Sequence, residues 1–388
     1  MIAPEIADDL AHYFQQLIVY KINPPFELLA ARLIALVKPG NGIKPDGIRP
    51  IAVGESLSRL LASIVFDRVK DKASTFLNPH QFGIKTIDGA SVAAIASDTF
   101  FNAEENNFIF NLDFKNAFNS VKREAILNFF FHFYGKESDL IYNSCGLKSS
   151  SGVQQGDPLG PILFCLAIHK TLNIIKQKYP SIKIVAYKDD ISLIGSFDLL
   201  ELVAQEIADS YGNIGLHLNA SKCLLIGSSA QDLVINDSIV PFTNYSSDSV
   251  KFLGCWLGNV PQMQNELQAI LEKMKIELDS ISALDIEKHI KFFMLKICYT
   301  GRITHILRSC APSIALDFCR SFNSLRTEIF GDLLDVEPGM LKSHLFSSAN
   351  LGGIGFTKSS ILCQSAFLGG GKKIFMNFLV DFLMILIW

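Results

Sequence analysis

The chain has 388 residues, of which 49% are hydrophobic and 19% charged, and its formal net charge is −3. This composition excludes a disordered chain and predicts a globular protein whose length divides into two or three subdomains. Without a net positive charge, any site for a polyanion must depend on a local cluster of basic residues. The eight cysteines form no Cys-x-x-Cys pair, which argues against a zinc module or a disulfide scaffold.

Hydrophobic periodicity and turn residues predict the elements of the first half of the chain. The expected order is a helix over 5–20, a strand over 32–38, a return strand over 47–53, helices over 55–77 and 88–102, and a buried strand over 108–113. Helices over 122–133, 161–178 and 199–212, a strand pair around 215–226, and helices from about 260 onward complete the prediction. We find no internal repeat and no low-complexity linker.

An acid pair, Asp189 and Asp190, lies between two short apolar runs over 184–187 and 191–195. Each run is typical of a strand, so the pair is predicted to lie in or beside the turn of a hydrophobic hairpin. Two adjacent carboxylates repel each other and resist desolvation unless a cation neutralises them. A divalent ion with oxygen ligands, such as magnesium, fits this need, whereas a solvated turn is the ordinary alternative.

Basic residues gather in the segment 288–326, where seven lysines and arginines stand against the single acid Asp317. The functional interpretation is a track for a phosphate backbone, and the structural interpretation is a solvated helix face. Sequence alone leaves the two open.

The two chain ends give no sign of a membrane protein. The N-terminus lacks the basic and apolar regions of a secretory signal. The apolar stretch 374–388 is interrupted by Asp381 and is shorter than the roughly 20 residues that cross a bilayer. We therefore expect no membrane association, a location in the nucleus or cytoplasm, and a packed helix or a non-native tail at 374–388.

Four motifs in order carry the functional prediction. They are Asn111-Leu112-Asp113 with Phe118 five residues after the acid; Gln154-Gln155-Gly156-Asp157-Pro158-Leu159-Gly160-Pro161; Tyr187-Lys188-Asp189-Asp190; and Gly215 to Cys223 followed by Phe252-Leu253-Gly254. In this order and spacing they resemble the palm motifs of reverse transcriptases. The string from Gly156 to Pro161 is similar to the non-LTR (LINE-like) retrotransposon branch. Lys44 to Ile51 resembles a fingers motif of that family, and Gln81-Phe82-Gly83 its next landmark.

The resemblance implies a set of site residues. Asp113 and Asp189 would bridge two Mg²⁺ ions, and Asp190 would help to hold the catalytic one, because nucleotidyl transfer uses a pair of metals. Arg49 and Lys44 would neutralise the triphosphate. Gln155 and Gly156 would line the nucleotide pocket, Phe118 would lie under the sugar, and Lys222 would be a candidate proton donor to pyrophosphate.

Three of these residues have ordinary alternatives. Phe118 could be a core aromatic, Lys222 a surface lysine, and Arg49 a solvated residue at a hairpin edge. One residue departs from the family pattern, because Lys188 stands before the acid pair where a small or apolar residue is usual. Strand alternation predicts that Lys188 points away from Asp189.

The resemblance implies an α/β (α+β) right-hand polymerase fold, with partial fingers over 1–105, an antiparallel-sheet palm over 106–258, a helical thumb over 259–356 and an apolar tail over 357–388. The implied function is RNA-directed DNA synthesis, with an RNA template, a DNA primer and dNTPs as partners and Mg²⁺ as cofactor. The absence of endonuclease and ribonuclease H segments suggests a truncated element copy. The alternatives are an RNA-directed RNA polymerase, disfavoured by Phe118 and Lys188, and a catalytically inactive nucleic-acid-binding remnant. The oligomeric state is left open.

Overall fold

The structure is a computed structural model that describes residues 4–19, 22, 25, 31–37, 47–126 and 151–369. The predictions for Lys44, for 127–133 and for the apolar stretch 374–388 lie outside the described residues.

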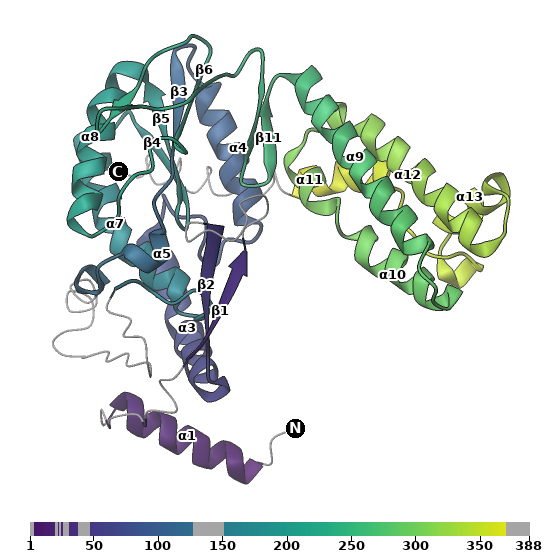
Figure 1. Ribbon diagram of the computed structural model, residues 1–388, viewed down its shortest axis with the longest axis horizontal. Coiled ribbons are helices and arrows are strands. Elements are labelled where there is room, and N and C mark those ends of the chain that lie inside the picture. The colour runs from purple at the N-terminus through teal and green to yellow at the C-terminus, as the bar shows by residue number, and fades with distance from the viewer. Residues whose placement is uncertain are drawn as a thin grey trace, which may run out of the picture.

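Helices and strands are mixed in the described residues up to 258, and in those from 260 to 369 the regular elements are helices (Figure 1). The mixed part comprises α1 (Pro4–Val19), β1 (Ala31–Val37), β2 (Ile48–Gly54), α3 (Ser56–Leu77), α4 (Gly89–Phe101), β3 (Asn107–Leu112), α5 (Ala117–Ser120), α7 (Gly160–Lys178), β4 (Lys183–Tyr187), β5 (Asp190–Ser196), α8 (Phe197–Asn213), β6 (Leu224–Gly227), β7 (Val234–Ile235), β8 (Ser238–Ile239), β9 (Phe242–Asn244), β10 (Ser249–Phe252) and β11 (Cys255–Gly258). The helical part comprises α9 (Val260–Ser282), α10 (Lys288–Thr300), α11 (Thr304–Ser309), α12 (Pro312–Leu334), α13 (Pro338–Phe346), a 3₁₀ turn (Ala349–Leu351) and a helix over 359–369.

A five-stranded sheet in the order β4-β5-β3-β6-β9 forms the centre of the mixed part. The pairs β4–β5 and β5–β3 are antiparallel, in keeping with the predicted antiparallel sheet, and so is the pair β3–β6, but β9 joins β6 in parallel. The predicted strand pair around 215–226 is wrong, because β6 pairs with β3 instead and Leu218 forms only an isolated bridge with Phe114. Both partners lie about a hundred residues earlier, beyond the reach of local periodicity.

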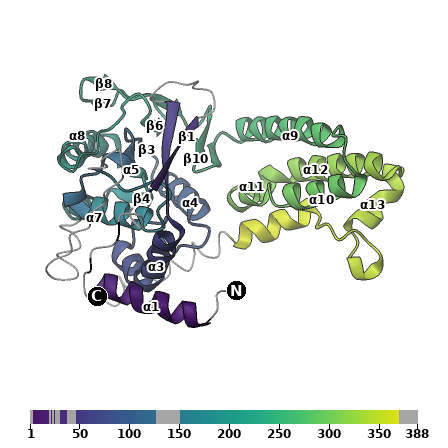
Figure 2. The same cartoon turned by 60° about the horizontal axis from the view of Figure 1, so that its bottom comes forward.

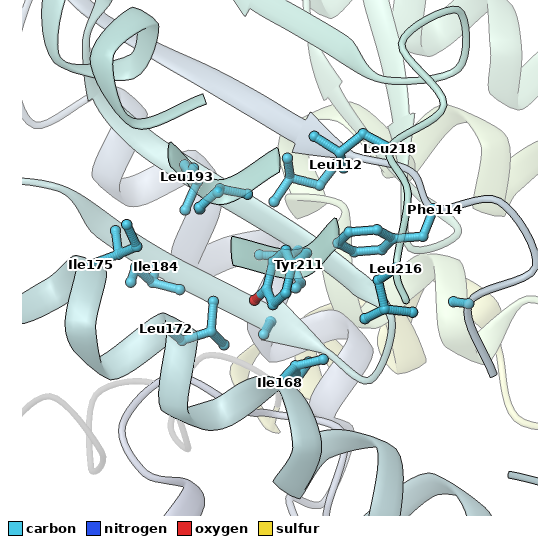
Figure 3. Close-up of a cluster of buried hydrophobic side chains, with 14 of the residues drawn as sticks. Leu112, Phe114, Ile168, Leu172, Ile175, Ile184, Leu193, Tyr211, Leu216 and Leu218 are labelled. Atoms are coloured by element: carbon cyan, nitrogen blue, oxygen red, sulfur yellow. The ribbon is translucent and has the colours of Figure 1, made fainter. Parts of the chain in front are cut away.

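Strand alternation gives the sheet two apolar faces, each covered by helices. Phe108, Phe110 and Leu112 of β3 share a core with the inner residues of α7 and α8. Ile109 of the same strand packs on the opposite face with Ala93 and Ala96 of α4. Figure 3 shows part of the larger core, where the fully buried Tyr211 of α8 lies among leucines and isoleucines of β3, β4, β5 and α7.

The helical part has a separate core formed by α9 to α13 and the helix over 359–369. Figure 2 shows these helices as a lobe beside the sheet, joined to it through α9 after β11. Within α9, buried Leu267, Leu271, Met274 and Leu278 recur every three or four residues, which places them on one helical stripe. Among the described residues, no helix is long and apolar enough to cross a membrane.

A separate hairpin of β1 and β2 lies below the sheet in the view of Figure 1. The strands pair from Ala31 with Gly54 to Val37 with Ile48, so that Arg49 is opposite Leu36. The hairpin is tied to the loop before α7 because the Ala52 amide donates to the Gln155 carbonyl at 2.9 Å.

Candidate active site

The acid pair lies at the tip of the β4–β5 hairpin. Tyr187 pairs with Asp190, which leaves Lys188 and Asp189 as a two-residue turn. Lys188 has a φ of 60°, in the left-handed region that a non-glycine residue adopts only when its surroundings hold it there. The strand alternation from which the direction of Lys188 was predicted does not apply, since Lys188 and Asp189 lie in the turn and not in a strand. The Lys188 Nζ lies 5.3 Å from the centroid of the Tyr187 ring.

Asp113 is the residue directly after β3 and lies beside the same turn. The last register pair between β3 and β5 joins Leu112 to Ile191, and Asp113 and Asp190 are the next residues outward on their strands. The backbone of Asp113 is held from its other side by the segment before β6. Its carbonyl accepts from the Asn219 amide at 2.8 Å, and its amide donates to the Cys223 sulfur at 3.3 Å.

The electrostatics confirm that the three carboxylates share one region. Loss of solvent, together with the charges of Asp189 and Asp113, raises the pKa of Asp190 to about 6. Burial and the charge of Asp113 also raise the pKa of Asp189, whereas Lys188 and Arg49 act to lower it. The protein thus concentrates negative charge here that nearby cations only partly neutralise.

The chemistry of this donor set suits a hard divalent cation. Carboxylate oxygens are the ligands that Mg²⁺ takes in proteins, and the excess negative charge favours a cation. Among the described residues, however, no group of three or more His, Cys, Asp or Glu side chains is arranged to hold a metal ion. The backbone therefore places the carboxylates together, while their side chains do not converge on one point.

Arg49 reaches this region from the β1–β2 hairpin. It is an exposed residue, and its positive charge acts to lower the pKa of Asp189. The hairpin and the sheet are far apart in sequence, so this proximity depends on how the two are packed together.

The loop before α7 positions Gln155 and Gly156 next to the hairpin. Gly156 has a φ of 112°, and a β-carbon there would come within 2.7 Å of the Ala52 carbonyl oxygen. Glycine is thus required for the loop to approach β2. The sequence predicted a close approach of Gly156 to the nucleotide; the close approach that the structure shows is to the backbone of the hairpin.

Phe118 lies on the short helix α5, just after Asp113. Its ring stacks on the buried ring of Phe164 with the centroids 4.7 Å apart and the planes at 26°. The residue is half-buried and packs against the edge of the main core. Both the sugar-facing interpretation and the core interpretation are compatible with this position.

Lys222 is exposed and lies in the turn that holds Asp113. The Lys222 amide donates to the Asn219 carbonyl at 2.8 Å, and the Asn219 amide in turn donates to the Asp113 carbonyl. The structure therefore brings Lys222 to the segment beside the acids.

Two residues of this region were not assigned a role from sequence. The Cys223 thiol lies against the Asp113 backbone, and burial raises its pKa to about 11. Gln81 binds both backbone groups of Lys188 through its side-chain amide. Sequence analysis identified Gln81 only as part of a motif. Its contact with Lys188 could not be predicted because the two residues are 107 positions apart.

The basic segment 288–326 is not a free positive track. Every one of its seven cations has a partner: Lys288 with Asp335, Lys291 with the Ser282 carbonyl, Lys296 with the Ile354 carbonyl, Arg302 with Glu277, Arg308 with Asp88, Arg320 with Asp317, and Arg326 with Asn323, Thr357 and Ser359. Arg326 is only 4% exposed, and burial lowers its pKa to about 10. Three of the partners, Glu277, Asp335 and Asp88, lie outside the segment and were therefore not included in its charge count.

Comparison with known proteins agrees with this geometry. Residues 37–257, more than half of the chain, match the family model described as reverse transcriptase (RNA-dependent DNA polymerase). The chain is 26% identical over 292 residues to a retrovirus-related Pol polyprotein from the type-2 retrotransposable element R2DM of Drosophila melanogaster, covering 65% of this chain and 27% of that one. It is 27% identical over 267 residues to the type-1 element R2 protein of Popillia japonica, covering 60% and 37%.

A third relative, the retrotransposable element SLACS 132 kDa protein of Trypanosoma brucei gambiense, is 23% identical over 360 residues, covering 85% of this chain and 29% of that protein. The chain thus spans between about a quarter and two fifths of the length of these relatives. Among solved structures, apo telomerase from Candida tropicalis matches at a TM-score of 0.47 with 11% identity, covering 99% of this chain and 70% of that one. A likeness this remote adds nothing to the assignment.

The sheet with its terminal carboxylates, the separate hairpin and the helical lobe define a right-hand polymerase fold. The chain belongs to the reverse transcriptase family. Its similarity to retrotransposon Pol proteins confirms the branch predicted from the string between Gly156 and Pro161.

Proposed function

We propose that this chain is an RNA-directed DNA polymerase that extends a DNA primer with dNTPs on an RNA template, using two Mg²⁺ ions. The observation that carries the proposal is the placement of the Asp189–Asp190 turn beside Asp113 at one end of the sheet, in a chain of the reverse transcriptase family.

Asp113, Asp189 and Asp190 would hold the two ions. When bound, the ions activate the primer 3′-hydroxyl and stabilise the charge on the triphosphate and the leaving group. The raised pKa of Asp190 supports this assignment because a bound cation relieves the repulsion between the carboxylates. The side chains would need only to rotate about their χ angles, since the backbone already brings the strand ends together.

The remaining residues would bind and orient the nucleotide. Arg49 would contact the triphosphate from the hairpin, with Lys44 as a weaker neighbour. Gln155 and Gly156 would line the pocket between hairpin and sheet, and Phe118 would lie under the sugar. Lys222 would hold a proton for the leaving pyrophosphate.

The subdomains follow from this assignment. We propose partial fingers over 1–105, a palm over 106–258 and a thumb that begins at 259. The thumb was predicted to end at 356, before an apolar tail over 357–388, but the helix over 359–369 packs in the thumb core and is assigned to the thumb. The two separate cores support the boundary at 258–259. The first boundary is less sharp, because α3 and α4 pack on the same sheet as the palm helices.

Primer extension on an RNA template with Mg²⁺ tests the function directly. We expect dNTP incorporation by the wild-type chain and a loss of at least about a hundredfold in Asp189→Asn, because metal catalysis contributes several kcal/mol to the barrier. Binding of an RNA–DNA hybrid should survive in the variant. Asp198→Asn, on the exposed start of α8, is the matched control and should extend normally.

The other candidate is a catalytically inactive nucleic-acid-binding protein. It is favoured by the side-chain arrangement of the carboxylates, which form no ligand cluster among the described residues. Hybrid binding by the wild-type chain without any incorporation, in Mg²⁺ or Mn²⁺, would select this candidate and exclude the polymerase.

A further inference from the structure

Gln81 lies beside the catalytic turn although it comes from a segment outside the sheet. Residues 80–82 run along the open edge of β4, where the Phe82 amide donates to the Ala186 carbonyl at 2.7 Å and the Ala186 amide donates to the His80 carbonyl at 2.8 Å. Gln81 bridges Ala186 in parallel and is only 4% exposed. Its side chain is therefore fixed at the point where β4 enters the turn.

The side-chain amide of Gln81 forms hydrogen bonds with both the backbone amide and the backbone carbonyl of Lys188. Its Oε1 accepts from the Lys188 amide at 2.6 Å, and its Nε2 donates to the Lys188 carbonyl at 3.3 Å. The same Oε1 accepts from the Gly83 amide at 3.0 Å, which closes the 81–83 segment around the contact. A glutamine can make this pair of bonds because it carries an acceptor and donors on one planar group.

Lys188 needs such support for two reasons. Its backbone is left-handed, a conformation that persists in a non-glycine residue only when the surrounding structure determines it. Its amide and carbonyl also lie in a two-residue turn, outside the ladder between β4 and β5. Gln81 supplies partners for both groups.

The packing around the contact is tight. A β-carbon on Gly83 would come within 2.7 Å of the Lys188 Cγ, 2.8 Å of its amide nitrogen and 2.9 Å of the Gln81 Oε1. Glycine at 83 is thus what allows the segment to close on the turn.

We infer that Gln81 is a positioning residue for catalysis: by fixing the Lys188 peptide, it sets the direction in which the neighbouring Asp189 and Asp190 present their carboxylates. The inference rests on the proposed function of those acids. Small displacements of reacting groups reduce rates strongly, by about a hundredfold for 1 Å, so release of the turn should act on the chemical step.

The test is Gln81→Met, which keeps the length and volume of the side chain and removes its hydrogen bonds. We expect kcat for primer extension to fall by about ten- to a hundredfold, while KM for dNTP and Kd for an RNA–DNA hybrid change less than about threefold. Amide hydrogen exchange, measured without substrate, should become faster at Lys188 and Gly83.

Asn107→Leu is the matched control. Asn107 is also buried in the sheet region and donates one side-chain hydrogen bond to the Phe100 carbonyl at 2.9 Å, but it lies at the opposite end of β3 from Asp113. It should lower the melting temperature about as much as Gln81→Met and leave kcat and the exchange at Lys188 unchanged. If Gln81→Met fails to fold, Gly83→Ala displaces the same contact and should give the same loss of kcat.

The outcomes separate the inference from the proposed function. If Gln81→Met exchanges faster at Lys188 but keeps the wild-type kcat, the positioning role is overturned. The same holds if Gln81→Met and Asn107→Leu lose kcat to the same extent. If the wild-type chain does not extend a primer, the proposed function fails, and the exchange experiment still decides whether Gln81 holds the turn.

Discussion

Arg308 on α11 forms an ion pair with Asp88, the residue immediately before α4, and so joins the helical lobe to the sheet. The same helix also contacts the hairpin β10–β11, where a β-carbon on Gly254 would come within 2.7 Å of the His305 Nε2. The sequence had left open whether Arg308 belongs to a phosphate track or to a solvated helix face. The structure instead places it in an ion pair between the lobe and the residue before α4.

We predict that Arg308→Met weakens this junction. Because Arg308 is 39% exposed and Asp88 19% exposed, a double-mutant cycle with Asp88→Asn should give a coupling energy of only about 0.5–1 kcal/mol by urea unfolding. A looser lobe should release the hybrid sooner, so the number of nucleotides added per binding event should fall several-fold.

Arg320→Met is the control for this prediction. Arg320 pairs with Asp317 within α12, and both side chains are largely exposed. Its loss should change neither the unfolding free energy nor the length of product. Equal product lengths in Arg308→Met and Arg320→Met would show that the ion pair does not orient the lobe.

A second prediction concerns sugar selection by Phe118. A ring beneath a deoxyribose collides with a 2′-hydroxyl, and discrimination of this kind is worth about 1–3 kcal/mol. Phe118→Val should therefore raise the kcat/KM for rNTP relative to dNTP by about ten- to a hundredfold.

The control is Phe164→Leu, which removes the buried ring on which Phe118 stacks. It should reduce stability and leave the ratio of the two substrates unmoved. A ratio that stays constant in both variants would assign Phe118 to the core alone.

The cations of the helical lobe give a third prediction. Lys291 and Lys296 donate to backbone carbonyls, and Arg302 binds Glu277. Neutralising all three should lower the melting temperature. Because these cations already have partners within the protein, the slope of log affinity against log salt should change by much less than the roughly 2.7 expected for three phosphate contacts. A change in slope close to 2.7 would show that the three cations contact the phosphate backbone.

The stability of the mixed part should depend on two buried histidines. His80 and His169 are 4% and 1% exposed, and burial lowers the pKa of each to about 4. The unfolded chain therefore binds protons between about pH 6.5 and 4 that the folded chain does not. The free energy of unfolding should be at its full value above pH 6.5 and fall by a few kcal/mol as the pH is lowered to 4.

Replacing His169 by leucine should reduce this fall, measured by urea unfolding at several pH values. His217→Gln is the control, because His217 is exposed and should leave the pH dependence unchanged. An unaltered fall in His169→Leu would mean that other groups cause the acid sensitivity.

Much of the secondary structure could be predicted because its signals are local. The helical spacing of α3, the apolar run of β3 and the two apolar runs around Asp189 each lie within a window of some twenty residues, and these elements agree with the observed ones within a few residues. The same holds for the order of the motifs, which predicted the family that the comparison confirms.

The environment of each residue was decided only by the tertiary structure. Gln81 meets Lys188 across 107 positions, and Arg308 meets Asp88 across 220. Lys288 and Arg302 likewise pair with acids outside the basic segment. Such pairings depend on how the sheet, hairpin and lobe pack, because helix and strand periodicity fixes only which face of an element is buried. Local sequence patterns specified most of the elements and the motifs. The packing determined that Lys188 is held in a turn, that β9 joins the sheet in parallel and that the seven cations of 288–326 have partners within the protein.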